Sequence, residues 1–410
     1  MRNFLFFGLL IAFISLMSCR ANDVVYAPFF KGSKNLDNPY GVCSHINRTG
    51  FQNEYDTREK ELKQIKEAGV SLLRTDFDWG VCQKNHSELY DFTRYDTILT
   101  ECKNNKVDVL GILTHLPQRN FLEWLDYVEN VSRHYSKRVK YWEVLNEADR
   151  VYKWIPGFRV STYNEYIESA YRAIKRNSNA SVVYSGLADA CDGTIEQLLQ
   201  EEKSRCYDIM NIHWYANKER EPEEIIDYCE RYAEILNRYQ IYKPVWLTET
   251  GCTTAPHWAS EMTQADRLPR IFLISFALGI DKVFWYKTRS SELDSMDREG
   301  YFGLWHKDYM PKPAFYAYQT LTRLCPDKST RPQLIRDGSV YVAFWRRPDK
   351  KKVWALWTTK GRQTISVSVN GHYSAINNMG HIKQIDVDKV EISPSVTYVV
   401  GAKNLTIRDI

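Results

Sequence analysis

The strongest constraint on the fold is a repeat of short apolar runs separated by stretches with helical periodicity. Eight such runs alternate with helix-like stretches over about 290 residues, a pattern typical of a (β/α)8 barrel in the α/β class. A doubly wound open sheet is the alternative, but that fold usually has a glycine-rich phosphate loop after its first strand, and no such loop follows the first run. The runs are 40–45, 71–77, 107–114, 139–145, 181–186, 209–214, 244–248 and 281–286.

The pattern changes after Cys325-Pro326, where short alternating runs replace the helical periodicity. These runs predict a small antiparallel β-sandwich of about 80 residues, and the early apolar stretch 24–30 is a candidate extra strand for it. They are 340–345, 353–358, 364–369, 382–387 and 396–400. We therefore divide the chain into a signal segment (1–18), a linker (19–37), a barrel (38–325) and a sandwich (326–410).

The first residues are expected to direct export. An apolar run over residues 4–17 follows Arg2 and is shorter than a comfortable membrane span. Residues 16–19 read Leu-Met-Ser-Cys and resemble the bacterial lipobox, in which cleavage leaves a lipid-modified cysteine. We expect Cys19 to anchor the exported protein to a bacterial membrane, at the outer membrane or cell surface. An ordinary signal cut slightly later and an uncleaved anchor are the alternatives.

Two glutamates follow apolar runs at the positions where a barrel places its catalytic groups. Asn146 and Glu147 end the fourth run, and Glu249 ends the seventh. Catalytic side chains of such barrels project from the C-terminal ends of strands, and the fourth and seventh strands face each other across the mouth. Cleavage of a glycosidic bond with retention needs two carboxyls about 5–5.5 Å apart, one protonated and one ionised.

This pattern resembles the clan A glycoside hydrolases, which include families 39 and 5, over nearly the whole predicted barrel. The resemblance implies that Glu147 is the acid/base and that Glu249 is the nucleophile. It also implies that Asn146 hydrogen-bonds the sugar 2-hydroxyl. The expected product keeps the anomeric configuration of the substrate.

Further site residues follow from the same resemblance. Arg74, in the segment that closes the second run, is expected to contact Glu249 and to keep its carboxylate ionised by lowering its pKa. His213 and Tyr215 belong to the segment that closes the sixth run, and both are expected to line the site. One of the two should orient the nucleophile, and the sequence does not select between them.

Aromatic residues and one further histidine complete the predicted site. Trp285, in the eighth run, resembles the aromatic floor beneath the sugar, and His115, after the third run, is expected to reach the same sugar. Trp79 is a candidate for stacking on a sugar face. The alternative for His115, and for His213, is a wall residue that makes no contact with the sugar. Glu143 stands before the strand tip and is expected to point away from the site.

Other chemistries have little support in the sequence. The 55 basic and 51 acidic residues leave a net charge of +4, too weak a field to indicate a nucleic-acid partner. The sequence has no zinc-protease, P-loop, nucleophile-elbow or EF-hand motif, and its nine histidines are scattered. We therefore expect no metal site, and the expected mechanism needs no cofactor.

The sequence thus predicts a monomeric, lipid-anchored, retaining β-glycosidase that cleaves an oligo- or polysaccharide. Two alternatives remain at this stage. One is a catalytically inactive surface lipoprotein that binds glycans. The other is a transglycosylase, which forms the same covalent intermediate but passes the sugar to another acceptor. The residues quoted do not select the sugar, the linkage, or endo or exo action.

Overall fold

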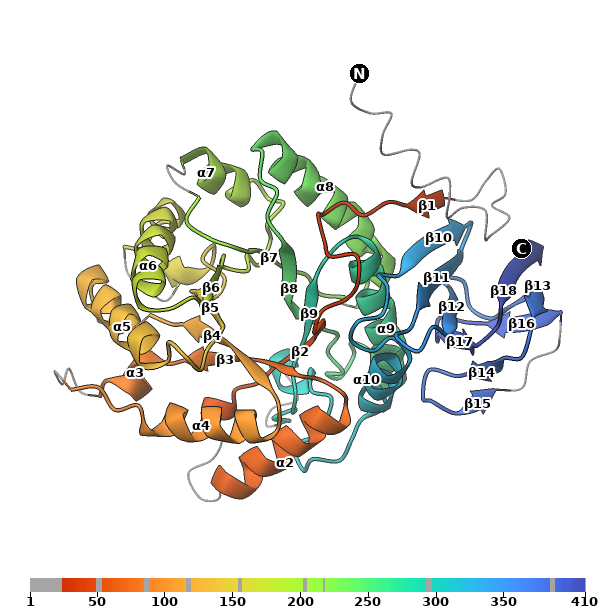
Figure 1. Cartoon of the computed structure of the whole chain (residues 1–410), viewed down its shortest axis with the longest axis horizontal. Coiled ribbons are helices and arrows are strands. Elements are labelled where there is room, and N and C mark those ends of the chain that lie inside the picture. The colour runs from red at the N-terminus through yellow and green to blue at the C-terminus, as the bar shows by residue number, and fades with distance from the viewer. Residues whose placement is uncertain are drawn as a thin grey trace.

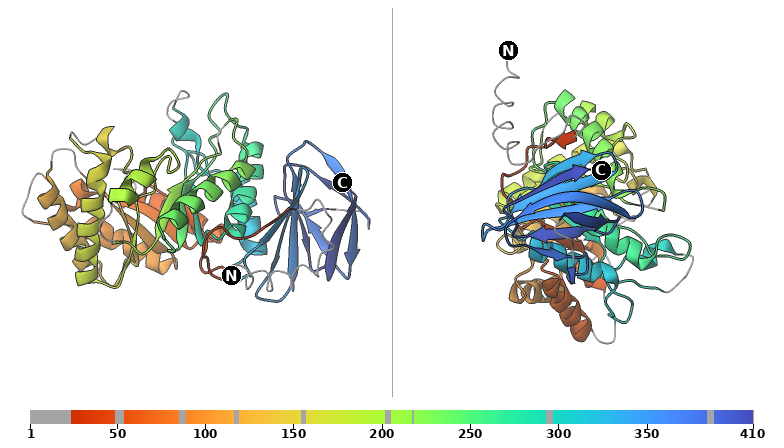
Figure 2. Two further views of the ribbon diagram at one scale, coloured as in Figure 1. Left: turned by 90° about the horizontal axis from the view of Figure 1, so that it is seen from above. Right: turned by 90° about the vertical axis from the view of Figure 1, so that its right-hand side faces the viewer.

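A barrel and a β-sandwich lie side by side in the computed structural model (Figures 1 and 2). Residues 1–23, which include the predicted signal and Cys19, lie outside the described residues. The structure describes residues 24–48, 54–84, 89–115, 119–153, 157–201, 205–216, 218–292, 297–383 and 388–409.

Eight parallel strands form the barrel, and each lies within or overlaps one of the eight predicted runs. They are β2 (Tyr40–Cys43), β3 (Leu72–Phe77), β4 (Asp108–Leu113), β5 (Tyr141–Val144), β6 (Ser181–Val183), β7 (Met210–His213), β8 (Val245–Thr250) and β9 (Lys282–Tyr286). Their order in the sheet is β6-β5-β4-β3-β2-β9-β8-β7. An isolated parallel bridge between Val183 and Ile209 joins the two end strands. The predicted (β/α)8 fold is therefore confirmed.

Helices surround the barrel, as Figure 1 shows. They are α2 (Glu54–Glu67), α3 (Trp79–Cys82), α4 (Thr93–Asn104), α5 (Phe121–His134), α6 (Tyr163–Asn177), α7 (Thr194–Glu201), α8 (Ile225–Arg238), α9 (Glu261–Ala277) and α10 (Pro313–Leu324). Short 3-10 turns are η1 (Ile46–Arg48), η2 (Val151–Lys153), η3 (Val160–Thr162), η4 (Pro222–Glu224) and η5 (Arg298–Tyr301). Helix α5 begins with a capping box, in which Asn120 accepts from the Glu123 backbone amide and Glu123 accepts from that of Asn120. No helix in the described ranges is both long enough and apolar enough to cross a membrane.

The C-terminal strands form two antiparallel sheets that pack face to face. One sheet has the order β1-β10-β11-β12-β17-β14-β15 and the other β16-β13-β18. The strands are β1 (Val24–Tyr26), β10 (Gln333–Asp337), β11 (Val340–Arg346), β12 (Lys352–Thr358), β13 (Gln363–Asn370), β14 (Ser374–Ile376), β15 (Ile382–Lys383), β16 (Lys389–Ile392), β17 (Thr397–Val400) and β18 (Asn404–Asp409). Strand β1 pairs with β10, so the N-terminal segment adds an edge strand to this domain.

The barrel and the sandwich share one apolar core. Trp345 and Trp357 belong to the same buried cluster as the barrel helices. The Trp357 indole donates to Glu223 Oε1 at 2.8 Å, and Glu223 also pairs with the buried guanidinium of Arg270. Trp345 donates to the carbonyl of Leu324 at 2.9 Å. These contacts fix the sandwich against α9, α10 and η4, away from the carboxyl ends of the barrel strands.

Candidate active site

The carboxyl ends of the barrel strands open into a cavity of about 1160 Å³. Its wall is built from segments that follow β2, β3, β5, β6, β7, β8 and β9. Six of the predicted site residues, including both glutamates, line this cavity. The predicted residues in this wall are Arg74, Asn146, Glu147, His213, Tyr215 and Glu249.

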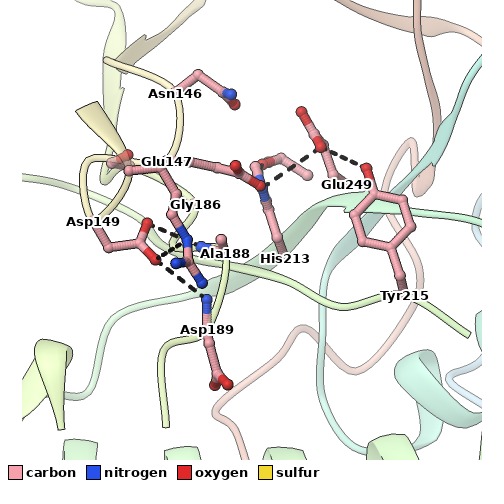
Figure 3. A network of polar contacts seen from close by, with 12 residues as sticks. Asn146, Glu147, Asp149, Gly186, Ala188, Asp189, His213, Tyr215 and Glu249 are labelled. Atoms are coloured by element: carbon pink, nitrogen blue, oxygen red, sulfur yellow. Dashed lines mark hydrogen bonds and ion pairs between the residues drawn. The ribbon is translucent and has the colours of Figure 1, made fainter. Parts of the chain in front are cut away.

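Glu249 lies near the end of β8 and is held at both carboxylate oxygens. Arg74 donates from Nη1 to Oε1 at 2.5 Å, and the Tyr215 hydroxyl donates to Oε2 at 2.5 Å (Figure 3). The side chain of Glu249 is 10% exposed. Burial raises the pKa of this carboxyl, but the neighbouring His213 and Arg74 and the Tyr215 hydrogen bond lower it by more. Glu249 is therefore an ionised, accessible and oriented carboxylate.

Arg74 connects Glu249 to a second buried carboxylate deeper in the barrel. Its Nε and Nη2 donate to Glu143 at 2.7 and 2.9 Å, and Nη2 also donates to Asn146 Oδ1 at 2.7 Å. Glu143 is fully buried. The sequence-based expectation that Glu143 points away from the site is wrong, because it faces the barrel interior and fixes the guanidinium that holds Glu249. The pairing of Glu143 with Arg74 connects β5 to β3, and sequence spacing gave no signal for it.

Glu147 lies in a sharp turn directly after β5. Leu145 and Glu147 both have positive φ angles, 60° and 44°, in the left-handed region that non-glycine residues rarely adopt. This turn directs the Glu147 side chain, which is 27% exposed, into the cavity. Carboxylate oxygens of Glu147 and Glu249 lie within 4.8 Å of each other. The two carboxyls therefore converge, although 102 residues separate them in the sequence.

His213 lies between the two carboxyls and is fully buried. Its Nδ1 is 3.1 Å from Glu147 Oε1 and 3.6 Å from Glu249 Oε2 (Figure 3). Its Nε2 is 3.1 Å from the Thr248 hydroxyl, which donates its own proton to Asn211 Oδ1. Nε2 must therefore carry a proton and donate to Thr248, because the hydroxyl hydrogen is already used.

This hydrogen-bond pattern requires a second proton at the contact between His213 and Glu147. With Nε2 protonated, a neutral imidazole would present a bare Nδ1 lone pair to the Glu147 oxygen, which is repulsive. One proton must therefore lie on Nδ1 or on the Glu147 oxygen. Burial lowers the pKa of His213, but the charge of Glu249 and the hydrogen bond to Glu147 raise it by more. A proton is therefore held between His213 Nδ1 and Glu147 Oε1, beside the cavity.

Asp149 holds the Glu147 turn against the segment that follows β6. Its carboxylate accepts from the backbone amides of Ala188 and Asp189 at 3.0 and 3.4 Å (Figure 3). The amide of Ala148 donates to the Ser185 hydroxyl at 3.0 Å. The sequence reading did not single out Asp149. These contacts fix the turn that orients Glu147.

Tyr286, and not Trp285, is the aromatic residue of β9 that lines the cavity. Trp285 is fully buried among the barrel core residues, whereas Tyr286 lies in the cavity wall. The prediction that Trp285 forms the floor beneath the sugar is therefore wrong by one position. Successive side chains of a strand point to opposite faces, so a shift of one residue exchanges the core position for the cavity position.

Trp79 and His115 belong to an aromatic cluster that is separate from the cavity wall. Trp79 is fully buried, stacks on Tyr127 with ring centres 5.4 Å apart, and donates to Gln83 at 2.8 Å. His115 is half-buried, and its Nε2 lies 3.2 Å from the Tyr166 hydroxyl. Neither residue lines the cavity. The predicted sugar contacts of Trp79 and His115 are therefore wrong, because the two rings pack against each other and against neighbouring aromatic residues.

The same side chains have a spacing that a metal ion can use. Within the described ranges, Glu147, His213 and Glu249 each offer one ligand atom within 4.8 Å of the others. However, Arg74 and Tyr215 already donate to the two oxygens of Glu249. The adjacent guanidinium also places a positive charge beside any bound cation, which disfavours a divalent ion. The donor set fits proton transfer better than metal binding.

Comparison with known proteins gives this geometry a chemical context. Residues 161–296 match the family model described as the glycosyl hydrolase catalytic core. This segment is similar to the catalytic core of glycosyl hydrolases. The match includes His213, Tyr215 and Glu249, whereas Arg74 and Glu147 precede it. It confirms the prediction of a glycoside hydrolase with a carbohydrate substrate. A comparison with curated protein sequences finds no match.

Solved structures of glycoside hydrolases have the same fold as this core. A family 39 glycoside hydrolase from Bacteroides cellulosilyticus has 19% identity and a TM-score of 0.73, covering 89% of this chain and 81% of its own. A monomeric β-xylosidase from Caulobacter crescentus has 13% identity and a TM-score of 0.64, covering 90% and 97%. A family 30 endoxylanase from Clostridium papyrosolvens has 12% identity and a TM-score of 0.61, covering 90% and 98%. The predicted resemblance to clan A is confirmed, and at these identities it shows a shared fold.

Proposed function

We propose that the glycosyl hydrolase core cleaves β-glycosidic bonds with retention by double displacement. In the first step Glu249 attacks the anomeric carbon, and the bond from that carbon to the leaving oxygen breaks. The proton stored between His213 and Glu147 passes through the Glu147 carboxyl to the leaving oxygen. The product of this step is a glycosyl ester of Glu249 and a free alcohol.

The second step returns both carboxyls to their starting states. Glu147, now ionised, takes a proton from a water molecule, and the water oxygen attacks the anomeric carbon. The bond between that carbon and Glu249 breaks, which releases the sugar with its original configuration. Arg74 and Tyr215 stabilise the carboxylate that leaves, because both donate to its oxygens. We expect Asn146, which lines the cavity, to bind the sugar 2-hydroxyl, and the proposed reaction needs no cofactor.

The observation that carries this proposal is the separation of the two carboxyls. Oxygens of Glu147 and Glu249 lie within 4.8 Å across an open cavity. Retaining enzymes have carboxyls about 5–5.5 Å apart, whereas inverting enzymes need about 6.5–9.5 Å to admit a water molecule. The short separation supports direct attack by Glu249. The pKa of Glu249, lowered despite its burial, also suits a nucleophile.

Proton NMR of the first sugar released from an aryl glycoside or oligosaccharide tests the stereochemistry. Retained configuration is expected, and an inverted product would contradict the mechanism. Two variants separate the roles of the carboxyls. Glu249→Gln should lose about 10⁴-fold or more in kcat on every substrate. Glu147→Ala should lose much less on aryl glycosides with good leaving groups, which need no protonation, than on oligosaccharides.

We also propose that the protein is exported, anchored through Cys19 and monomeric. The lipobox-like residues 16–19 support the anchor. Labelling with a radioactive fatty acid in a bacterial host should mark the wild type and leave Cys19→Ala unlabelled. Equal labelling of both would contradict the anchor. Light scattering of the purified protein without residues 1–19 should give the mass of one chain.

A further inference from the structure

One part of the cavity wall carries an excess of positive charge. We call it the cationic wall, and it consists of Arg150, Lys153, Arg220 and Arg231. Arg150 and Lys153 follow Glu147 on the same segment, Arg220 follows β7, and Arg231 lies on α8. Two lining carboxylates belong to this side of the cavity within the described residues: Glu147, on the same segment as Arg150 and Lys153, and Asp189, which follows β6.

The other lining cations of the cavity have carboxylate partners that also line it. Arg48 pairs with Asp76 at 2.6 Å, Arg298 pairs with Glu299 at 3.2 Å, and Arg74 pairs with Glu249. Within each pair the opposite charges roughly cancel each other's field. The positive charge of the cavity surface is therefore carried mainly by the side that holds the cationic wall.

Two residues of the cationic wall have no carboxylate partner among the described residues. Lys153 and Arg231 are exposed, and neither lies within 4.0 Å of a described carboxylate oxygen. Arg150 lies 3.5 Å from Asp149, which also accepts the amides of Ala188 and Asp189. Like charges gathered on a concave wall raise the local concentration of anions.

The guanidinium of Arg220 is held over an aromatic ring at the cavity wall. Its Cζ lies 5.8 Å from the centre of the Trp214 ring, and Trp214 is buried. A guanidinium stacked on an aromatic ring is a favoured donor to carboxylate and sulfate oxyanions. This arrangement combines an apolar surface with a charged edge, as a charged sugar requires.

We propose that the cavity takes an anionic glycan, whose sulfate or carboxylate groups bind the cationic wall on the leaving-group side of the cleaved bond. This inference rests on the proposed function, since Glu147 marks the leaving-group side by protonating the departing oxygen. Figure 3 shows Asp149, Ala188 and Asp189 beside Glu147, and Tyr215 beside Glu249. Arg150 and Lys153 follow Glu147 in the chain and line the same cavity, which puts them on the side of the departing oxygen.

The test compares oligosaccharides that differ only in charge, with binding measured by calorimetry in a hydrolysis-deficient Glu249→Gln background. One pair is a sulfated and an unsulfated β-1,3-glucan oligosaccharide. The other is a glucuronoxylan oligosaccharide and its carboxyl-reduced form. At about 0.05 M salt the charged member of at least one pair should bind about tenfold tighter, and added salt should reduce the difference. The pair that shows the preference identifies sulfate or carboxylate as the recognised group.

A double variant, Lys153→Gln with Arg231→Gln, should remove most of this preference. It breaks no ion pair with a described residue, so its melting temperature should match that of the parent. The control is Arg346→Gln with Lys351→Gln, which removes the same two charge types from exposed positions of the sandwich. The control should keep the preference. Equal affinity within both pairs, or equal losses in the two double variants, would overturn the inference.

Hydrolysis assays with the wild type separate this inference from the proposed function. Cleavage of neutral glycans without any preference for charge would overturn the anionic substrate and leave the double-displacement mechanism intact. Charge-selective binding that depends on Lys153 and Arg231, without cleavage of any member of the panel, would support the cationic wall and overturn the glycosidase proposal.

Discussion

Arg74 shows how a single residue connects the barrel core to the chemistry at its mouth. Its guanidinium is 3% exposed and donates to Glu143, Asn146 and Glu249. A buried cation with two carboxylate partners is stable only while the partners remain, because removal of one leaves an uncompensated charge. The pKa of Arg74 is raised, since burial lowers it and the charges of Glu143 and Glu249 raise it by more. Arg74 is therefore a positioning residue as well as a source of charge.

Replacement of Arg74 should affect both folding and catalysis. Arg74→Met leaves Glu143 buried without its cation, so the free energy of unfolding should fall by about 3–5 kcal/mol. Arg74→Lys keeps the charge but loses the fork that reaches three partners, and kcat should fall by about 10²-fold or more with a smaller loss of stability. Urea unfolding and kinetics on an aryl glycoside measure the two effects. A normal kcat in Arg74→Lys would show that catalysis does not need the planar guanidinium of Arg74 to hold its three partners.

His213 gives the protein a defined dependence of stability on pH. Its pKa is raised above the ordinary 6.5, so its charge stabilises the folded state fully below pH 6.5. This contribution is lost as the pH rises through the raised pKa. The difference in unfolding free energy between the wild type and His213→Gln should be largest below pH 6.5, while Glu249 stays ionised, and should shrink at higher pH. Urea unfolding across this range measures it, and a difference that grows with pH would contradict the proton assigned to the contact with Glu147.

At the scale of elements, the site depends on turns that follow the strands. Glu147 reaches the cavity because the turn after β5 takes positive φ angles, and Asp149 ties this turn to the next one. Asp149 is 6% exposed, and burial raises the pKa of its carboxyl. Two backbone amides depend on it for their hydrogen bonds. The orientation of the acid/base is thus set by a contact between neighbouring strand-to-helix connections.

Removal of the Asp149 carboxylate should displace Glu147. Asp149→Ala leaves the partly buried amides of Ala188 and Asp189 without their acceptor, which should cost about 1 kcal/mol of stability. It should lower kcat by about tenfold or more and change KM less, because Asp149 acts through Glu147 and does not contact the sugar. Asp192→Asn, an exposed substitution nearby, is the control and should change neither value. An unchanged kcat in Asp149→Ala would show that the turn holds its shape without this contact.

The register of β9 separates a core residue from a cavity residue at adjacent positions. Trp285→Ala should lower stability by about 3–5 kcal/mol, because it removes a fully buried indole. Tyr286→Ala should lower stability much less and should raise KM or lower kcat, since Tyr286 lines the cavity. Thermal unfolding and kinetics of both variants provide the measurement. The opposite pattern would place Trp285 beneath the sugar.

The sequence predicts elements better than side-chain directions, for physical reasons. Eight apolar runs locate the barrel strands because buried parallel strands need continuous apolar segments. Glu147 and Glu249 can be predicted because polar residues at strand tips interrupt these runs. Glu143 and Tyr286 cannot, because alternation along a strand has two phases and the apolar run does not fix which phase faces the cavity. The prediction that Trp79 and His115 contact the sugar failed for a related reason, because aromatic residues near loops pack in the core as readily as they bind sugars.

At the scale of the whole molecule, barrel closure assembles a site whose parts are far apart in the sequence. Arg74 comes from β3, Glu147 follows β5, His213 ends β7 and Glu249 lies on β8. The family 39 structure and this chain have this fold in common at 19% identity, so the fold tolerates extensive change outside its core. The sandwich does not line the cavity within the described residues.

The shared core predicts that the barrel and the sandwich unfold together. Trp357 stacks on Tyr341 with ring centres 5.6 Å apart and donates to Glu223 beside Arg270. Trp357→Ala should lower the free energy of unfolding by about 3–5 kcal/mol. Calorimetry should show one transition at a lower temperature in this variant. Two transitions, of which the one assigned to the barrel is unchanged, would show that the domains are independent.

Covalent trapping of the glycosyl intermediate tests whether Glu249 is the nucleophile. The probe is a 2-deoxy-2-fluoro aryl glycoside of whichever sugar the wild type releases fastest, because the fluorine slows breakdown of the intermediate. Mass spectrometry of peptides from the inactivated protein locates the label. The double-displacement mechanism predicts one sugar esterified to Glu249 in the wild type and no label in Glu249→Gln. A label on a different residue, or an active enzyme that is never labelled and gives an inverted product, would contradict it.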